Sequence, residues 1–516
     1  MSRELVLVSG NVITMEPSRP SAEAVSLRDG RIRVVGTNQE ALADAGGLAE
    51  VVDLKGKAVL PGFIDTHTHL VSYGLMQLLA VDLNGCASVA DIQDRLRKKC
   101  QSTPPGVWIP GFGFDQAKLA ERRYPLREEL DAVAPNHPVL IGRIDGHSSV
   151  ANSLALAKLG LPPDIAGLEK DPSSGQPTGV LRQEAHYLSR ERAAEAYAQV
   201  EAMEKGLQLA AAEAIKAGVT TIHVMAGTEF VGDGDVEALL RSEDRLPVRT
   251  VMYWQTRDAE RVASSGLTGI GGCYGIMADG AIGSHTAAVY EPYYDNPSAR
   301  GSLYWRDEDL LAFIREAHLR RLQVSIHAIG DRAIGQVLSA FATVLHENPR
   351  PDHRHRIEHF IVPTSEQIWL AANLGIAIST QPAFEHIWGA EKLYLHRLGP
   401  ERVRRTHPLK SSLSAGLLVA GGSDCFVSPI DPLLGMHGAV NHPNEAQRIS
   451  ITQALALFTT NAAKMAFEER EKGSIKEGKL ADLVILEENI LDAPGQIIKD
   501  IPVRGTISRG QIVHWA

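Results

Sequence analysis

The sequence predicts an α/β fold: a (β/α)₈ TIM barrel, a small composite β-sandwich domain from both termini, and a large insertion after the first barrel strand. Two patterns carry this prediction. Both ends of the chain alternate apolar and polar residues, as half-buried strands do. The middle alternates short apolar runs with amphipathic helical segments, which favours a parallel sheet closed into a barrel.

The composition is typical of a globular protein and excludes several classes. Hydrophobic residues make up 44% and charged residues 22% of the 516 residues, which argues against a disordered or coiled-coil chain. The net charge is -10 and no basic run stands out, so a nucleic-acid partner is not expected. No apolar run reaches the roughly 18 residues that a membrane span needs. Four cysteines in so long a chain are not a disulfide framework, so we expect a reduced, cytoplasmic compartment.

Strand patterns at the two ends predict one shared domain. The N-terminal patterns cover residues 4–15, 23–36 and 50–59, and the C-terminal patterns cover residues 479–486 and 503–513. Asp29-Gly30 marks a hairpin turn within the second pattern. We therefore expect residues 1–59 and 470–516 to form the composite β-domain and residues 60–469 to form the barrel domain.

Eight short apolar runs in the middle are the candidate barrel strands. They cover residues 63–69, 219–225, 248–254, 274–279, 323–327, 356–360, 376–381 and 418–424. Residues 70–218 separate the first two runs, which is too long for one helical connection. We expect an insertion at about 75–190 on the face where barrels build their substrate pockets.

Two histidines at the end of the first candidate strand suggest a metal site. His67 and His69 are two residues apart, and residues at that spacing point to the same side of a strand. Both imidazoles can therefore aim at one metal ion. The alternative is two unrelated exposed histidines.

Three more candidate ligands end later strands. His327, His359 and Asp424 each follow an apolar run, at the barrel face where active sites lie. Imidazole and carboxylate ligands together suit Zn²⁺ or a similar divalent ion. Taken singly, His359 could be a satisfied core histidine and Asp424 could be a helix N-cap.

Six motifs resemble the amidohydrolase superfamily. They are LPGFIDTHTHL, DGHSSVANSLAL, ADGAIGSHTAA, HAIGD, RIEHF and GGSD, in this order along the chain. The second and third are similar to the amidohydrolase-3 branch, with its N-substituted formamide deformylase-like metal-dependent hydrolases. The resemblance implies that His67, His69 and Asp424 bind a metal ion. It also implies that His327 and His359 bind a second metal, or that one binds the first metal and the other the substrate.

One position departs from the family pattern. Many relatives carry a carboxylated lysine at the end of the fourth strand, which bridges two metals, and the motif match places Gly275 there. We therefore expect one metal, most simply Zn²⁺, on His67, His69, His327 and Asp424. His359 would lie beside it, and His359 and Asp424 would act in catalysis, with Asp424 taking the proton of the activated water. Two metals bridged by Glu184 or Asp279 are the first alternative, and a lost or changed activity is the second.

The remaining site candidates are expected to bind substrate. They are His147 in the insertion, Trp254 at the end of the third strand, and Asp279 and His285 after the fourth. The alternatives are a loop-fixing hydrogen bond for His147, a solvated loop position for His285, and a pocket wall for Trp254.

The expected function is metal-dependent hydrolysis of a non-peptide C–N bond in a small organic molecule. A formamide, a linear amide or a cyclic amide would be such a substrate. The alternatives are a deaminase of an aromatic or heterocyclic amine, a metal-dependent lyase or isomerase, and a scaffold without activity. The full set of candidate ligands argues against the scaffold. The resemblance also implies a homodimer. The net charge and the short apolar runs argue against a nucleic-acid or membrane partner.

Overall fold

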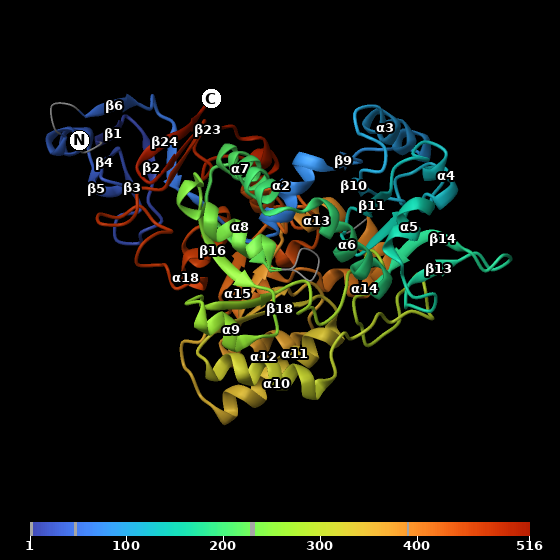
Figure 1. The fold of residues 1–516 in the computed structure, drawn as a ribbon. Helices are drawn as coiled ribbons and strands as arrows, with labels where there is room; N and C mark the ends of the chain where they lie inside the picture. The colour runs from blue at the N-terminus through green and yellow to red at the C-terminus, as the bar shows by residue number, and fades with distance from the viewer. Residues whose placement is uncertain (1–3, 46–48, 228–232, 390–391) are drawn as a thin grey trace.

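A barrel of parallel strands forms the centre of the protein. The computed structural model describes residues 4–45, 49–227, 233–389 and 392–516 (Figure 1). Its largest sheet contains, in spatial order, β8 (Phe63–Thr68), β15 (Val219–Ala226), β16 (Arg249–Trp254), β17 (Gly269–Gly272), β18 (Gln323–Ala328), β19 (Arg356–His359), β20 (Ala377–Thr380) and β21 (Val419–Gly421). A parallel bridge between Thr68 and Cys425 brings the two edge strands together, so the barrel is nearly closed. The predicted α/β barrel is confirmed.

The fourth strand is not where the sequence predicts it. Residues 274–279 form turns and bends, and β17 lies earlier, at Gly269–Gly272. Glycine is depleted in strands, so the run GIGG gives little strand signal. Packing requires glycine here, because a Cβ atom on Gly271 would lie 1.9 Å from the carbonyl oxygen of Ser325 on β18. The shift places Cys273 directly after the fourth strand.

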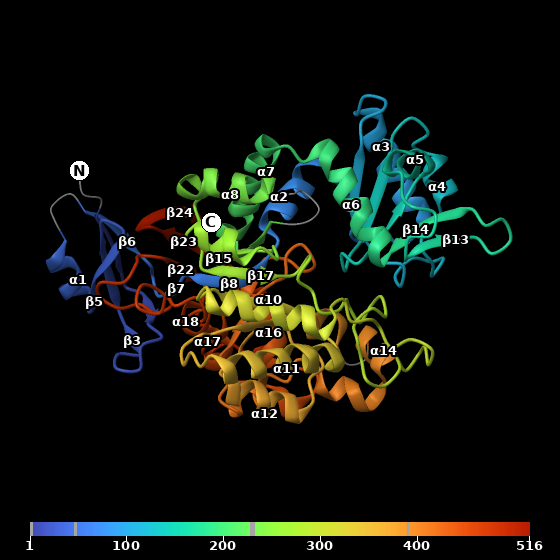
Figure 2. The same ribbon diagram turned by 60° about the horizontal axis from the view of Figure 1, so that its bottom comes forward.

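Helices cover the outside of the barrel (Figure 2). They include α7 (Val200–Lys216), α8 (Gly234–Ser242), α9 (Ala259–Ser264), α10 (Asp307–Leu319), α11 (Asp331–Glu347), α12 (Ser365–Leu374), α15 (Leu409–Ser414), α17 (Ile451–Leu457) and α18 (Thr460–Met465). In α11, Ile334, Val337, Leu338, Phe341 and Val344 are buried. Their spacing of three and four residues gives the helix one apolar face, which packs on the barrel. None of the described helices is long and apolar enough to cross a membrane.

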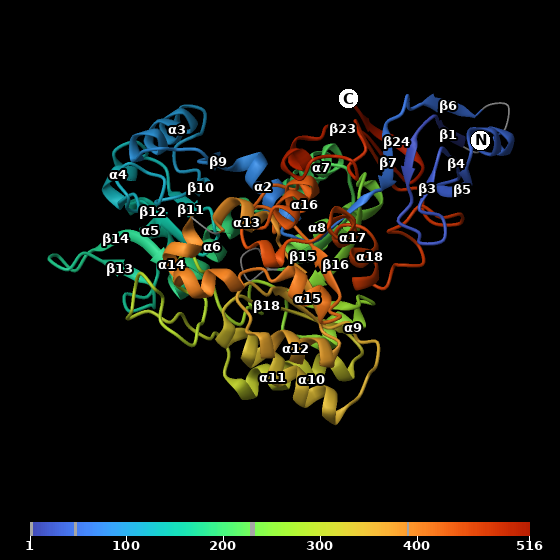
Figure 3. The ribbon, with the colours of Figure 1, turned by 180° about the vertical axis from the view of Figure 1, so that it is seen from behind.

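Strands from both ends of the chain share one sheet. β7 (Ala58–Pro61) pairs with β22 (Leu483–Leu486), and β23 (Val503–Ser508) and β24 (Gln511–Trp515) extend the sheet beyond β22. On the other side, β7 continues into β2 (Asn11–Ile13) and β3 (Ser21–Ala22). A second sheet contains β5 (Arg31–Gly36), β4 (Ala24–Arg28), β1 (Glu4–Val8) and β6 (Glu50–Asp53), in that order. Figure 3 shows both groups of strands at one end of the molecule. The domain boundaries at residues 59 and 470 remain our proposal.

A second α/β unit follows the first barrel strand. Its six strands are, in spatial order, β13 (Leu168–Lys170), β14 (Pro177–Arg182), β12 (Ser148–Ala151), β11 (Val139–Arg143), β10 (Ile109–Phe114) and β9 (Val81–Asp82). The unit also contains α3 (Val89–Gln101), α4 (Arg127–Asp131) and α5 (Ser153–Leu159). Two helices connect it to the barrel: α2 (Leu70–Leu79) leads in, and α6 (Gln183–Tyr197) leads back. Figures 1 and 2 show the unit beside the barrel, at the side away from the terminal β-strands.

Candidate metal centre

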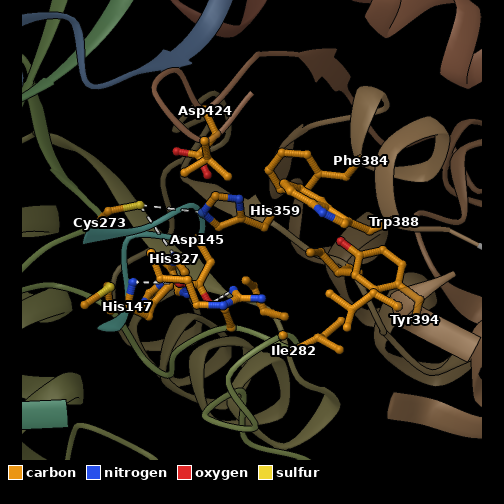
Figure 4. Close-up of a pocket in the computed structure, with 18 of the residues that line it drawn as sticks. Asp145, His147, Cys273, Ile282, His327, His359, Phe384, Trp388, Tyr394 and Asp424 are labelled. Atoms are coloured by element: carbon orange, nitrogen blue, oxygen red, sulfur yellow. Dashed lines mark hydrogen bonds and ion pairs between the residues drawn. The ribbon is translucent and has the colours of Figure 1, made fainter. Parts of the chain in front are cut away.

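A cysteine lies among three buried histidines at the carboxyl end of the barrel. The Cys273 Sγ atom is 3.4 Å from His67 Nε2 and 3.5 Å from His327 Nδ1. It is also 3.5 Å from His359 Nε2, and Figure 4 shows Cys273 directed toward His327 and His359. Nitrogen atoms from β8, β18 and β19 therefore converge on one sulfur atom.

A carboxylate completes the cluster on the side of the first strand. Asp424 Oδ1 is 3.3 Å from His67 Nε2 and 3.3 Å from His69 Nε2. Burial raises the pKa of Asp424, but hydrogen bonds from His67 and His69 outweigh it and hold the pKa well below its ordinary value. Asp424 is therefore ionised, as a metal ligand or a proton acceptor must be.

These side chains fit a divalent metal ion. Among the described residues, three groups bring ligand atoms within 4.8 Å of one another: His67, His69 and Cys273; Cys273, His327 and His359; and His67, His359 and Asp424. Imidazole, thiolate and carboxylate are the donors that Zn²⁺ takes in proteins. In addition, Nδ1 of His69 is buried without a hydrogen-bond partner. We refer below to His67, His69, Cys273, His327, His359 and Asp424 as the ligand cluster.

Neighbouring groups orient three of the imidazoles by contacting the ring nitrogen that faces away from the cluster. His67 Nδ1 lies 2.6 Å from a Glu358 oxygen, and His359 Nδ1 lies 2.7 Å from Gln381 Oε1. The Nε2 atom of His327 lies 3.2 Å from the carbonyl oxygen of Gly280. In each case the other ring nitrogen faces the cluster. Metal-binding histidines are commonly oriented by such outer contacts.

Glu358 is itself held by a buried network. Arg356 forms an ion pair with it, and Ser325 Oγ donates to Glu358 Oε1 at 2.5 Å. Burial raises the pKa of the Glu358 carboxyl, but Arg356 and His67 outweigh it and keep the pKa below its ordinary value. Arg356 and Glu358 lie two residues apart on β19, so both point into the barrel.

The backbone is unusual at two cluster residues. His359 has φ 70° and Asp424 has φ 55°, both in the left-handed region. Residues other than glycine adopt this conformation at a cost, and such residues gather at functional sites. Glu358 points inward, so regular strand geometry would turn its neighbour His359 outward. The left-handed backbone at His359 ends β19 and turns the imidazole toward the cluster instead.

Cys273 is the cluster residue that the sequence analysis missed, and the assignment of Gly275 was wrong. Because β17 ends at Gly272, the residue that follows the fourth strand into the cluster is Cys273. Gly275 lies in the next turn, and its carbonyl oxygen accepts hydrogen bonds from Arg257 at 3.2 Å. Burial raises the pKa of the Cys273 thiol to about 11 in the protein alone. The one available signal was a cysteine placed immediately after a glycine-rich run.

Two further candidates lie beside the cluster. The His147 ring is 5.9 Å from the His327 ring, and its Nδ1 is 2.7 Å from the Tyr187 hydroxyl. Asp279 is buried and accepts backbone hydrogen bonds from Ala288, Ile329 and Gly330. Its Oδ1 is 3.5 Å from His327 Nε2, the nitrogen that faces away from Cys273. Asp279 therefore orients a loop and His327, and its position does not support a bridging or substrate-binding role.

Trp254 points away from the cluster. It stacks against Arg261 and lines a separate hollow on the outside of the barrel. The preceding residue, Tyr253, faces the barrel interior, where its hydroxyl donates to Gln323 at 2.7 Å. Because side chains alternate along a strand, Tyr253 and Trp254 cannot both face inward. The position of Trp254 therefore does not support the predicted substrate contact.

Two other expected roles are not supported by position. His285 pairs with Asp295 at 3.0 Å and makes an edge-to-face contact with Tyr293, outside the cavity that borders the ligand cluster. Glu184 is exposed on α6 and lines a different cavity, together with Arg257. It therefore lies apart from the cluster that it was expected to bridge.

A cavity opens beside the ligand cluster. One wall is polar and contains His69, Cys273, His327, His359 and Asp424, together with Arg143, Asp145 and His147 from the insertion. The opposite wall is apolar and contains Ile282, Ile361, Phe384, Trp388, Leu393, Tyr394 and Val427. A mostly apolar hollow with converging polar groups is typical of a small-molecule site.

A parallel barrel with nitrogen, sulfur and oxygen ligands at its strand ends is the architecture of a barrel enzyme. A model described as the amidohydrolase family matches residues 50–514, so the chain belongs to the amidohydrolase family and is a hydrolytic enzyme. The predicted membership of the amidohydrolase family is confirmed.

Individual relatives span nearly the whole chain. YtcJ of Bacillus subtilis (strain 168) is 31% identical over 98% of this chain and 98% of its own. The N-substituted formamide deformylase of Arthrobacter pascens is 28% identical, again over 98% of each chain. Among solved structures, an uncharacterized metal-dependent hydrolase from Pyrococcus furiosus is 29% identical, with a TM-score of 0.76. That match covers 95% of this chain and 100% of the other.

Proposed function

We propose that this enzyme uses a divalent metal ion to hydrolyse a non-peptide C–N bond in a small organic molecule. A formamide, a linear amide or a cyclic amide would be its substrate. One observation supports this above the others: buried nitrogen, sulfur and carboxylate ligands converge beside a cavity that has an apolar wall. The similarity to an N-substituted formamide deformylase and to a metal-dependent hydrolase supports the same reaction class.

The proposed ligands are His67, His69, His327, His359 and Asp424, with Cys273 added. Zn²⁺ suits this mixture of donors. Cys273 belongs to two of the three ligand groups, one with His67 and His69 and one with His327 and His359. The simplest arrangement is a single ion bound close to β8, the first barrel strand. If two ions bind, Cys273 is better placed to be shared than Glu184 or Asp279.

A bound divalent ion would lower the pKa of water toward about 7 and polarise the amide carbonyl. Asp424 is ionised and borders the cavity, so it can accept the proton of the attacking water and pass it to the leaving nitrogen. His147 lines the same cavity, where its imidazole N–H can donate a hydrogen bond to the carbonyl oxygen as negative charge develops. The apolar wall excludes water from one side of the bond.

Deamination of an aromatic or heterocyclic amine is the second candidate, because Phe384 and Trp388 offer ring surfaces to such a substrate. A lyase or isomerase reaction would use the same cluster without water. We also propose a homodimer, on the resemblance alone. We propose a cytoplasmic location on the low cysteine content alone.

A substrate panel tests the reaction class. The purified chain, loaded with Zn²⁺, is incubated with formamides, linear amides, cyclic amides and aryl amines in water enriched in oxygen-18. We expect oxygen-18 in the carboxylate product, and loss of turnover in His67→Ala and Asp424→Asn proteins that still fold. Ammonia release from an aryl amine would favour the deaminase, and a product without oxygen-18 would favour the lyase or isomerase. Full activity in either variant would contradict the proposed site.

A further inference from the structure

We propose that the site takes an uncharged amide with an aromatic arm, and that Tyr394 donates a hydrogen bond to that substrate. This inference rests on the proposed function, because it assigns a substrate class to the same cavity. It depends on three features: an aromatic wall, an arginine whose charge is already balanced, and a tyrosine hydroxyl directed into the cavity.

The wall opposite the ligand cluster is shaped by aromatic rings. Phe384 and Trp388 come from α13 (Ala383–Trp388), and their ring centroids lie 4.7 Å apart at 68°. Tyr394 comes from α14 (Leu393–Arg402), which follows in the chain. Figure 4 shows these three rings on one side of His359, with Cys273 and Asp424 on the other. A substrate whose C–N bond lies at the cluster would place one arm against these rings. An aromatic arm gains area burial and edge-to-face contacts there.

Away from the ligand cluster, the described side chains that line the cavity offer no unpaired cation to a substrate carboxylate. Arg143 is the one lysine or arginine among the described residues that line it, and this side chain is buried. Its Nη1 atom lies 2.6 Å from Asp145 and its Nη2 atom 3.1 Å from Asp115, while Nε donates to Gln116. Two carboxylates thus more than balance one guanidinium.

A carboxylate on the substrate arm would therefore be buried without a partner. It would also face the negative charge of Asp145. Burying an unpaired charge costs several kcal/mol even after the protein relaxes, by the usual order of magnitude. The cavity should therefore discriminate against amides that carry a carboxylate, such as N-acyl amino acids.

Tyr394 is fixed so that its hydroxyl faces the cavity. Its ring stacks on His407, with centroids 6.1 Å apart and planes 23° apart, and His407 Nδ1 lies 2.7 Å from Glu385. Figure 4 shows the hydroxyl oxygen projecting from the apolar wall toward His359. Burial raises the pKa of Tyr394 well above its ordinary value, so the hydroxyl keeps its proton and can donate. A polar atom of the bound amide is the natural acceptor.

Three amides that differ in the aromatic ring and in charge distinguish the effect of the aromatic wall from that of the balanced arginine. N-acetyl-2-phenylethylamine carries the ring and no charge, N-acetylphenylalanine adds a carboxylate to it, and N-ethylacetamide lacks the ring. Their binding is measured by isothermal titration calorimetry on full-length, Zn²⁺-loaded Asp424→Asn protein, so that turnover does not consume them. We expect N-acetyl-2-phenylethylamine to bind at least about tenfold more tightly than either of the others.

Two variants assign the effect to residues. Trp388→Leu should reduce the preference for the ring to about threefold or less, whereas the exposed Trp369→Leu should leave it unchanged. Tyr394→Phe should weaken binding of N-acetyl-2-phenylethylamine by about five- to tenfold, the usual effect of one lost hydrogen bond. Tyr294→Phe, at an exposed tyrosine, is the control.

Three results would overturn the inference: equal or tighter binding of N-acetylphenylalanine, no measurable binding of N-acetyl-2-phenylethylamine, or Tyr394→Phe binding as wild type does. Failure of the proposed function looks different. The probes would then bind in the expected order, but wild-type protein would release neither acetate nor amine from them.

Discussion

Replacing Glu358 by glutamine tests the network that orients the ligand cluster. Glutamine keeps the size of the side chain but removes its negative charge. His67 then loses its carboxylate partner at 2.6 Å, and the buried Arg356 guanidinium loses its counter-charge. Breaking a fully buried pair typically costs about 3–5 kcal/mol. Removing the outer partner of a metal-binding histidine typically costs about 10–100-fold in metal affinity.

Both magnitudes are measurable against a matched control. Glu347 forms an ion pair with Arg315 at 2.8 Å on the surface, and Glu347→Gln should cost less than about 1 kcal/mol. Urea unfolding of the metal-free proteins gives the stability difference, and competition with a chromophoric zinc chelator gives the affinity. If Glu358→Gln matches Glu347→Gln in both assays, Glu358 does not orient His67 for metal binding.

Three further changes probe the site, a buried acid and the barrel packing. Cys273→Ser should lower the zinc affinity by at least about tenfold in the chelator competition, because the metal would lose the sulfur atom that lies beside three imidazoles. Unchanged affinity would show that Cys273 is not a ligand. Burial raises the pKa of Asp235 to about 7, although Gly227 and Val236 donate backbone hydrogen bonds to it. The folded state therefore binds this proton more tightly than the unfolded state, and the resulting stability is lost as the pH rises from about 4 to 7. Asp235→Asn should be more stable than wild type at pH 8 by up to a few kcal/mol, with the difference vanishing near pH 4. An advantage that does not change with pH would contradict this. Phe341→Ala should cost about 3–5 kcal/mol in urea unfolding, because the ring is fully buried between α11 and the barrel. A loss below about 1 kcal/mol would contradict that packing.

The barrel and most of the ligand cluster follow from local sequence patterns. The two-residue repeat of a strand places His67 and His69 on one side, and the alternation of strands and helices predicts the barrel. The ends of strands β18 and β19 bring His327 and His359 to the same place. These predictions succeed because they depend on local patterns that tertiary packing preserves.

The errors arise where packing overrides the local pattern. The glycines of β17 give no strand signal, yet close approach to β18 requires them, and the error hid Cys273. Trp254 was expected to face inward, but the register of β16 turns Tyr253 inward instead. No single-sequence pattern reports such a register.

Other roles depend on side-chain contacts that the fold creates. Glu358 lies beside His67, Arg143 between Asp115 and Asp145, and His285 beside Asp295. Each partner is recognisable only when the fold brings the segments together. The left-handed backbone at His359 and Asp424 is likewise invisible in the sequence.

Metal content is the most direct test of the ligand cluster. Plasma mass spectrometry on protein purified without chelator or added metal gives equivalents per chain, and the same measurement follows dialysis against Zn²⁺. We predict at least about one equivalent of a divalent metal in the wild type and its loss in His67→Ala. A wild-type chain that holds no metal and takes up none from Zn²⁺ would contradict a metal-dependent hydrolase.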